Sequence, residues 1–195
     1  MRKVVVCTNL SLDGVMQAPA RPDEDQRGGF TRGGWAAPYG AMAHAGQVFA
    51  AADALLLGRR TYEDFYHVWP KRTDSPFTPW LNNVRKYVAS RTLREPLPWT
   101  NSVLLAGDTR QALGSVKQEP GKDILVMGSG ELVRSLMPTG IIDEYVLLIH
   151  PIVLGSGRRL FADRGTLTQL TLVSSSTTSN GVIVGTYKPG KASDQ

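Results

Sequence analysis

Three short segments combine glycine or serine with arginine in patterns that suit phosphate binding. The first, Gly58-Arg59-Arg60-Thr61, directly follows the apolar run 55–57. Glycine permits a tight turn, and the free N–H groups at the start of a helix attract anions, so a phosphate is expected beside Arg59. Thr61 with Asp64 three residues later also matches a helix-capping pattern. The alternative interpretation is an ordinary strand-to-helix turn with solvated arginines.

The second segment is Gly128-Ser129-Gly130-Glu131-Leu132-Val133, which follows the apolar run 124–127. Its first and third positions match the glycines of a dinucleotide-binding turn. Val133 stands where a third Gly or Ala is usual, and no acidic residue marks the expected later strand. A helix N-terminus facing a pyrophosphate is the physical prediction for this segment.

The third segment is Ser90-Arg91, at the end of the strand-like run 87–89. A guanidinium matches the oxygens of a phosphate monoester and a serine hydroxyl adds a neutral hydrogen bond, a pair suited to the 2′-phosphate of NADP. A solvated loop is the alternative. If the three segments follow successive parallel strands, they meet at one edge of a sheet, where open α/β sheets bind ligands.

The hydrophobic pattern predicts the elements that would place these segments. Short β-rich runs predict strands at 4–8, 54–57, 87–89, 102–105, 124–127, 144–153, 170–175 and 182–187. Apolar spacings of three and four predict helices at 39–52, 61–68, 109–118 and 131–137. This alternation indicates parallel βαβ units and an α/β fold. The last three strands have only loops between them, and Asn180-Gly181 suits a hairpin turn, so the sheet is expected to end antiparallel.

Two segments are expected to be loops. Residues 17–34 are rich in Gly, Pro and charge, with Phe30 inside and Trp35 just beyond. Loops of this length usually have a role, so a lid with aromatic substrate contacts and a mobile surface insertion are both considered. Residues 71–79 are expected to be a plain connector. The prediction is a single domain over residues 1–189 and a flexible tail at 190–195.

Composition limits the class of protein. The chain has 195 residues, a net charge of +5 and a pI of about 9.5. Its Lys and Arg residues are scattered in pairs, which favours local anion sites over a nucleic-acid surface. No run is long enough to cross a membrane, and no metal site is indicated. The single cysteine, Cys7, cannot form an internal disulfide and is expected to be buried, so a cytoplasmic location is expected.

The order of these motifs resembles the dihydrofolate-reductase-like superfamily, and most closely the C-terminal reductase domain of bacterial riboflavin-biosynthesis deaminase-reductases. The likeness covers nearly the whole chain. Its motifs are Ser11-Leu12-Asp13-Gly14, Gly58-Arg59-Arg60-Thr61-Tyr62, Ser90-Arg91-Thr92-Leu93, Gly128-Ser129-Gly130, and the run from Pro151 to Gly157 ahead of Leu160-Phe161.

The resemblance implies a three-layer fold with a mixed, mainly parallel sheet flanked by helices, and NADPH bound across its carboxyl edge. It assigns Gly58, Arg59 and Thr61 to a first phosphate-contacting turn, and Ser90 and Arg91 to the adenosine phosphate. It assigns Gly128, Ser129, Gly130, Glu131, Leu132 and Val133 to the pyrophosphate and nicotinamide side. It also implies a homodimer, for which the apolar C-terminal strands could supply the interface.

The substrate side departs from dihydrofolate reductases, which carry a carboxylate on the helix after the first strand. The corresponding segment, 39–49, contains no acid. His44 and Asp13 are therefore the candidate catalytic residues, each with a structural role as the alternative. The resemblance places Asp13, Pro151 and Gly155 at the substrate mouth, and Trp35, just beyond the 17–34 loop, is added as a possible aromatic contact.

The function expected from these observations is an NADPH-dependent reductase that transfers a hydride to a small heterocyclic, carbonyl or imine substrate. The riboflavin pathway is not implied directly, because the chain has no Cys/His zinc-deaminase motif. Two alternatives remain: a non-catalytic NADP(H)-binding regulatory module of the same fold, and nucleic-acid binding. The second is disfavoured because aromatic residues are not interleaved with a basic stripe.

Overall fold

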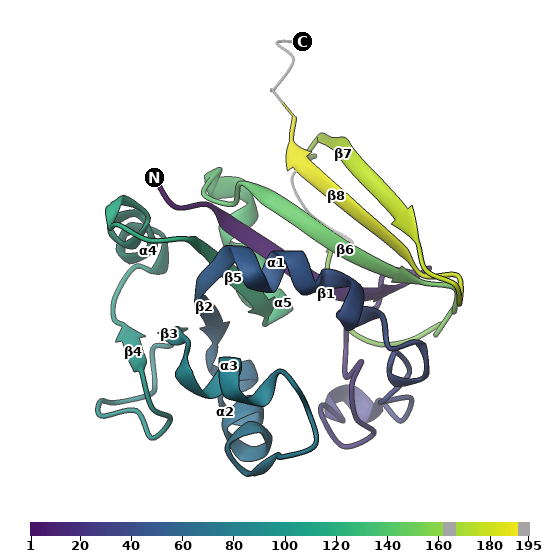
Figure 1. Cartoon of the computed structure of the whole chain (residues 1–195), viewed down its shortest axis with the longest axis horizontal. Coiled ribbons are helices and arrows are strands. Elements are labelled where there is room, and N and C mark those ends of the chain that lie inside the picture. Colours follow the sequence, from purple (N-terminus) through teal and green to yellow (C-terminus); the bar gives the residue numbers. More distant parts are fainter. Residues whose placement is uncertain (162–166, 191–195) are drawn as a thin grey trace.

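A computed structural model describes residues 1–161 and 167–190, which form one eight-stranded sheet with helices on both faces (Figure 1). The strands are β1 (Val4–Ser11), β2 (Ala52–Gly58), β3 (Arg85–Ala89), β4 (Ser102–Leu105), β5 (Asp123–Gly128), β6 (Glu144–His150), β7 (Leu170–Thr177) and β8 (Ile183–Pro189). The helices are α1 (Gly46–Ala51), α2 (Arg59–Val68), α3 (Thr78–Asn83), α4 (Thr109–Gln118) and α5 (Gly130–Leu136). Five short 3-10 helices, η1 (Arg27–Gly29), η2 (Ala37–Tyr39), η3 (Ala41–Ala45), η4 (Trp69–Lys71) and η5 (Met137–Thr139), complete the described elements.

The strand order is β4-β3-β2-β5-β1-β6-β8-β7. The first six of these strands pair in parallel, and β8 and β7 pair antiparallel. The predicted α/β fold with antiparallel C-terminal strands is thus confirmed. The predicted tail at 190–195 lies, apart from Gly190, outside the described residues.

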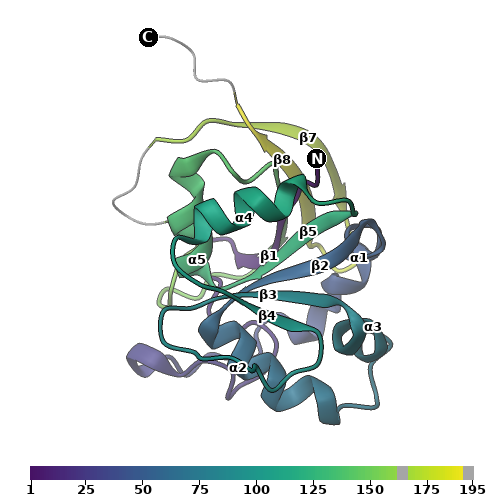
Figure 2. The same ribbon diagram turned by 90° about the vertical axis from the view of Figure 1, so that its left-hand side faces the viewer.

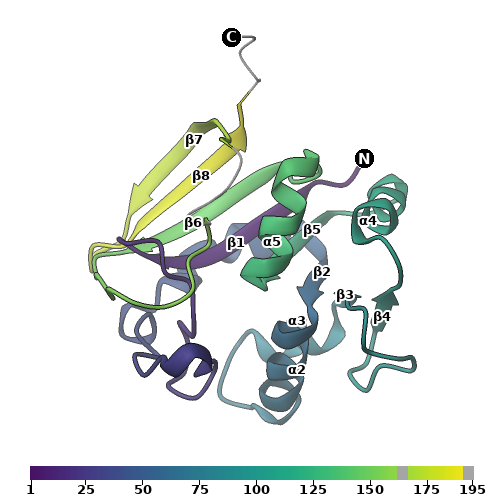
Figure 3. The same ribbon diagram turned by 180° about the vertical axis from the view of Figure 1, so that it is seen from behind.

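Alternation along the strands divides the core into two layers, one on each face of the sheet. On one face Val4, Val6 and Leu56 pack against apolar residues of α4 and α5. On the other face Val5 and Leu57 pack with residues of α1, α2 and α3. Figures 2 and 3 show α4 and α5 on the face opposite α1, α2 and α3. The side chains of central strands such as β5 are therefore covered on both faces, as expected for a parallel sheet.

The expected elements differ from the structure in three places. The helix expected at 39–52 is two 3-10 turns and the short helix α1, and β2 already begins at Ala52. The strand expected to reach residue 153 ends at His150, because Pro151 cannot donate to the ladder. The connector expected at 71–79 leads into α3, whose Pro79 lies in the first turn, where proline is well tolerated.

None of the helices within residues 1–161 and 167–190 is long and apolar enough to cross a membrane.

Candidate functional site

The three predicted phosphate-binding segments lie next to one another at the carboxyl edge of the sheet. In the strand register, Gly58 is opposite Ala89 and Leu57 is opposite Gly128. The ends of β3, β2 and β5 are therefore neighbours, and each is followed by one of the predicted segments. Parallel pairing of these strands brings together residues that are up to about seventy positions apart in the chain.

The junctions after β2 and β5 touch so closely that neither has room for a side chain at its glycine. A Cβ on Gly58 would lie 2.6 Å from Ser129 Oγ and 3.2 Å from the Ser129 backbone nitrogen. A Cβ on Gly128, whose φ is +141°, would lie 2.9 Å from Thr61 Oγ1. The Gly128–Ser129 peptide bond is cis. The two buried glycines thus let the junctions pack directly against each other, with the Ser129 and Thr61 side chains filling the space beside them.

Helix α2 begins three residues earlier than the capping pattern predicted. Its N-cap is Gly58, so Thr61 lies inside the first turn, and no side chain caps the helix. The Asp64 carboxylate accepts hydrogen bonds from the Arg21 guanidinium instead. The capping-box prediction is wrong, and the first-turn N–H groups of α2 are left without a side-chain acceptor, which favours an anion there.

The cationic side chains predicted for this edge are exposed. Arg59 donates to Glu63 one turn along α2, at 3.1–3.2 Å. Arg91 is exposed and has no ion pair with any residue that the structure describes. Ser90 Oγ accepts from the N–H groups of Thr92 and Leu93 at 3.1 and 3.0 Å, which holds the turn after β3. Ser90 Oγ also lies 3.4 Å from Thr92 Oγ1, and the Arg91 guanidinium is the donor that remains available at this turn.

The junction after β5 divides its residues between the surface and the core. Gly128, Ser129, Gly130 and Glu131 line a cavity. Leu132 and Val133 are buried in the core, and their N–H groups donate to Ser129 Oγ and to the Ser129 carbonyl. A direct cofactor contact at Leu132 or Val133 is therefore not supported by the geometry.

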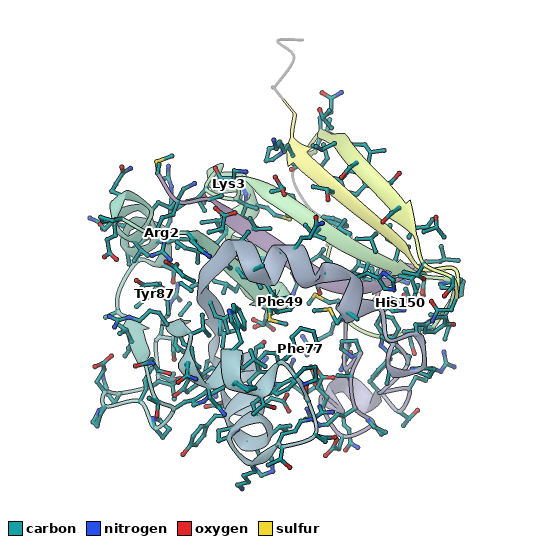
Figure 4. The ribbon with its side chains drawn as sticks, in the orientation of Figure 1. Arg2, Lys3, Phe49, Phe77, Tyr87 and His150 are labelled. Carbon is teal, nitrogen blue, oxygen red and sulfur yellow. The ribbon has the colours of Figure 1, made fainter. Side chains whose placement is uncertain are left out.

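The cavity has a volume of about 470 Å³ and lies at the carboxyl ends of β1 and β5, bordered by the 17–34 segment and by α1, α2 and α3. Its apolar lining includes Met42, Phe49, Phe65, Trp69, Phe77 and Met127. Phe49 and Phe77 lie near each other beneath α1, with ring centroids 5.2 Å apart (Figure 4). Such a volume and lining suit a small, flat organic molecule.

The remaining lining is charged, and most of its carboxylates are paired with arginine. Asp64 pairs with Arg21, Asp25 with Arg27, and Glu131 with both Arg60 and Arg158. Glu24 differs, because its Oε2 accepts only the backbone N–H groups of Ala20 and Arg21 among the described residues. Burial raises the pKa of Glu24, and the nearby Asp64 charge adds to that effect.

Asp13 and His44, the predicted catalytic residues, are not part of the cavity lining. The Asp13 carboxylate accepts hydrogen bonds from Ser11 Oγ, Leu154 N and Gly155 N at 2.6, 3.0 and 2.8 Å. Burial acts to raise the pKa of Asp13, but these hydrogen bonds outweigh it and lower the pKa to about 2. His44 is exposed on η3. The structure therefore brings neither residue to the cavity.

The predicted substrate residues Trp35, Pro151 and Gly155 also lie outside the cavity lining. Trp35 is buried in a small cluster with Phe30 and Leu154, and its indole N–H donates to the Gln17 carbonyl at 2.8 Å. The aromatic residues of the 17–34 segment thus stabilise the segment itself, while Met16–Arg21 and Glu24–Arg27 supply the cavity wall. The substrate-contact predictions for these three residues thus do not coincide with this cavity and stay predictions.

Several cavity residues carry no signal in the sequence that could have identified them. Asn9, Glu24 and Arg158 come from three segments that meet only in the folded chain. Phe77 lies in the stretch expected to be a connector, and the Thr78-Pro79 pair, typical of a helix start, was the available sign of α3. Cys7 lines the cavity from β1, and burial raises the pKa of its thiol to about 12, so it behaves as a small apolar group.

The fold and the site together define a class: a three-layer α/β protein of the dihydrofolate-reductase type, with a ligand cavity at the carboxyl edge of its sheet. The model of the family described as RibD C-terminal domain matches residues 2–184. The chain belongs to this family, which confirms the predicted resemblance.

Individual relatives agree with this assignment. The uncharacterized protein YyaP of Bacillus subtilis is 32% identical over 140 residues, which cover 69% of this chain and 73% of that protein. A solved structure from Shewanella sp. PV-4, provisionally assigned to riboflavin biosynthesis, has a TM-score of 0.69 at 20% identity and covers 97% of this chain and 99% of its own. Dihydrofolate reductase from Enterococcus faecalis, in complex with NADP(H), has a TM-score of 0.62 at 12% identity and 97% coverage of both chains. The two structures share the fold with this protein.

Proposed function

We propose that the protein binds NADPH across the carboxyl edge of the sheet and reduces a small heterocyclic, carbonyl or imine substrate in the cavity. The observation that carries the proposal is the close contact between the β2 and β5 junctions, where a Cβ on Gly58 or Gly128 would clash with the opposite junction. This contact brings the glycine-led turn after β5 beside the first turn of α2 at the carboxyl edge of the sheet, where open α/β proteins bind dinucleotides. Membership in a family of reductase domains supports the same function.

The residues present suit NADPH in three places. The first-turn N–H groups of α2 and the Arg59 guanidinium suit a pyrophosphate. Ser90 and Arg91, one strand away, suit the 2′-phosphate, and Gly128, Ser129, Gly130 and Glu131 border the cavity where the nicotinamide would face a substrate. When bound, NADPH would supply the hydride, and the chain would orient the substrate and exclude water.

The proton that completes the reduction must come from a group that reaches the cavity. Asp13 is held ionised by its hydrogen bonds, and His44 faces solvent. Water and Glu24 are the proton sources that the geometry favours. Glu24 borders the cavity and has no arginine ion pair among the described residues, and burial raises its pKa, which favours the protonated form.

The double variant Arg59→Ala/Arg91→Ala tests the phosphate assignment by calorimetry with NADPH and NADH. Loss of Arg59 removes a pyrophosphate contact that both coenzymes would make, and loss of Arg91 removes a 2′-phosphate contact that only NADPH would make. NADPH binding should therefore weaken by roughly 10- to 100-fold and NADH binding by less. Arg85→Ala is the matched control, since Arg85 lies at the opposite end of β3. Equal losses for the two coenzymes would contradict the assignment.

A non-catalytic NADP(H)-binding module of the same fold is the second candidate. It is favoured by the positions of Asp13 and His44 outside the cavity, and by the absence of an acid in the segment 39–49. NADPH oxidation, followed by absorbance against pterin, pyrimidine and quinone panels, separates the two functions. Tight NADPH binding with no oxidation by any panel member would favour the module.

A homodimer is also proposed, through the C-terminal strands. The outermost strand β7 and its neighbour β8 expose the apolar side chains of Leu172, Val173 and Ile183. An uncovered apolar edge strand is a common site of self-association. Elution as a monomer from a calibrated sizing column would contradict this.

A further inference from the structure

A buried histidine and an asparagine form a hydrogen-bonded pair beside the cavity. Asn9 lies near the end of β1 and lines the cavity. His150, labelled in Figure 4, is the last residue of the neighbouring strand β6. His150 has no solvent exposure, and its Nε2 is 2.9 Å from Asn9 Oδ1. The rings of Trp35 and Tyr39 pack edge-on against the imidazole, at centroid distances of 5.3 and 5.0 Å.

The surroundings of His150 determine which ring nitrogen carries the hydrogen. Burial lowers the pKa of His150 to about 4, so the ring is neutral near pH 7 and has a single N–H. Nδ1 is buried without a partner among the described residues. A hydrogen on Nδ1 would be an unpaired buried donor, which folded proteins rarely contain. The hydrogen therefore lies on Nε2 and is donated to Asn9 Oδ1.

This hydrogen bond determines the orientation of the Asn9 amide. If the amide were rotated by 180°, its NH2 group would need a lone pair on Nε2, and the ring hydrogen would move to the unpartnered Nδ1. The orientation with Oδ1 toward His150 is thus preferred. It leaves the Asn9 NH2 group with no hydrogen-bond partner among the described residues, at a position that lines the cavity.

Part of the cavity lining is apolar, so the Asn9 NH2 group is one of the few polar groups that a ligand could contact there. Cys7, Met42, Phe49 and Met127 are apolar neighbours in the lining, and the segment 39–49 contributes no acid. Asn9 is half-buried, and a ligand that fills this part of the cavity would displace water from the amide N–H, so a ligand with an acceptor atom at that point is favoured over one without.

We propose that Asn9 is a specificity-determining residue, which donates a hydrogen bond to a carbonyl oxygen or ring nitrogen of the bound substrate, and that His150 is its positioning residue. This inference rests on the proposed function, because it concerns the substrate of that same site. It narrows the substrate class to flat rings that carry an acceptor atom at the edge facing β1.

The test compares two probes of equal shape, quinoxaline, which has two ring nitrogens, and naphthalene, which has none. In ¹⁵N-labelled protein, quinoxaline should shift the Asn9 side-chain NH2 resonances and naphthalene should not. Asn9→Leu should weaken quinoxaline binding about three- to tenfold, the effect of one lost hydrogen bond, and leave naphthalene binding unchanged or stronger. Met127→Leu is the control and should affect both probes alike.

The positioning role of His150 is tested by two substitutions and one spectroscopic measurement. His150→Phe keeps an aromatic ring but loses the donor, and should reduce quinoxaline binding as Asn9→Leu does. His150→Gln retains an N–H donor and should restore most of that loss. The ¹⁵N shifts of His150 in the unsubstituted protein should show hydrogen on Nε2, a readout that does not depend on any variant folding.

Three results would overturn the inference: a hydrogen on Nδ1, no quinoxaline binding by the unsubstituted protein, or equal quinoxaline affinity in the unsubstituted protein and Asn9→Leu. These outcomes differ from failure of the proposed function. A protein that binds quinoxaline through Asn9 but does not bind NADPH would refute only the reductase proposal. A protein that oxidises NADPH and shows no effect of Asn9→Leu on probe binding would refute only this inference.

Discussion

Acidification should destabilise the folded protein through His150. The side chain is fully buried and its pKa is lowered by desolvation to about 4, against an ordinary value of 6.5. Between these two values the unfolded chain binds a proton at this residue and the folded protein does not. The free energy of unfolding therefore falls as the pH drops from about 6.5 to about 4, and the contribution is fully present above pH 6.5.

The size of the effect follows from the same two values. Each pH unit between these two pKa values lowers the free energy of unfolding by about 1.4 kcal/mol. The total loss through His150 is therefore at most about 3 kcal/mol. Folded domains are typically stable by only about 5–15 kcal/mol, so a loss of this size is readily measured.

Urea unfolding between pH 4 and 7.5, followed by tryptophan fluorescence, measures this dependence. The comparison is between the unsubstituted protein and His150→Phe, because Asp13 and Glu24 titrate in both and their contributions cancel. The unsubstituted protein should lose up to about 1.4 kcal/mol more per pH unit in the acid range than the variant. His44→Gln, at an exposed position, is the control and should retain the original slope. Identical slopes for the unsubstituted protein and His150→Phe would show that His150 is not held neutral by burial.

Three further predictions follow from the structure. Gly58→Ala places a Cβ 2.6 Å from Ser129 Oγ, so it should lower the free energy of unfolding in urea by about 1–3 kcal/mol and weaken NADPH binding. Gly114→Ala, in open space within α4, should raise the free energy of unfolding by about 0.5–1 kcal/mol. Lys86→Met removes an ammonium that donates to three backbone carbonyls at 2.9–3.1 Å, and should lower the free energy of unfolding by roughly 2–4 kcal/mol. Glu24→Gln should reduce kcat for NADPH oxidation about a hundredfold if Glu24 delivers the proton, while an unchanged kcat would assign that step to water. Glu144→Gln, at the amino end of β6 and outside the cavity lining, is the control.

Local patterns in the sequence predicted most of the sheet. Strand β4 and helix α4 have the predicted bounds, and β5 extends one residue further at each end, because alternation and apolar spacing are properties of the chain itself. The segment 39–52 was less predictable. Its alanines and glycines allow a helix, but packing against β6 and the early start of β2 produce 3-10 turns and only a short α1.

Some of the predicted site residues could likewise be identified from local sequence patterns, and others could not. Gly58 and Gly128 were identifiable from the sequence, because glycine between an apolar strand and a helix has a local meaning. Asp13 and His44 were chosen for their chemistry alone. In the structure, Asp13 accepts hydrogen bonds from Leu154 N and Gly155 N, and His44 is exposed to solvent.

The sequence by itself predicted most strands and helices in their order along the chain, the parallel and antiparallel parts of the sheet, and the family. The edge at which a phosphate-bearing ligand lies stays a prediction. Each of these depends on backbone geometry and on periodicities that neighbouring residues express together. Only the tertiary structure decided which side chains meet in the cavity, such as Asn9 with His150 and Glu24 with Asp64. Those meetings depend on the register between strands and on the path of the 17–34 segment, and neither is determined by residues that are adjacent in the chain.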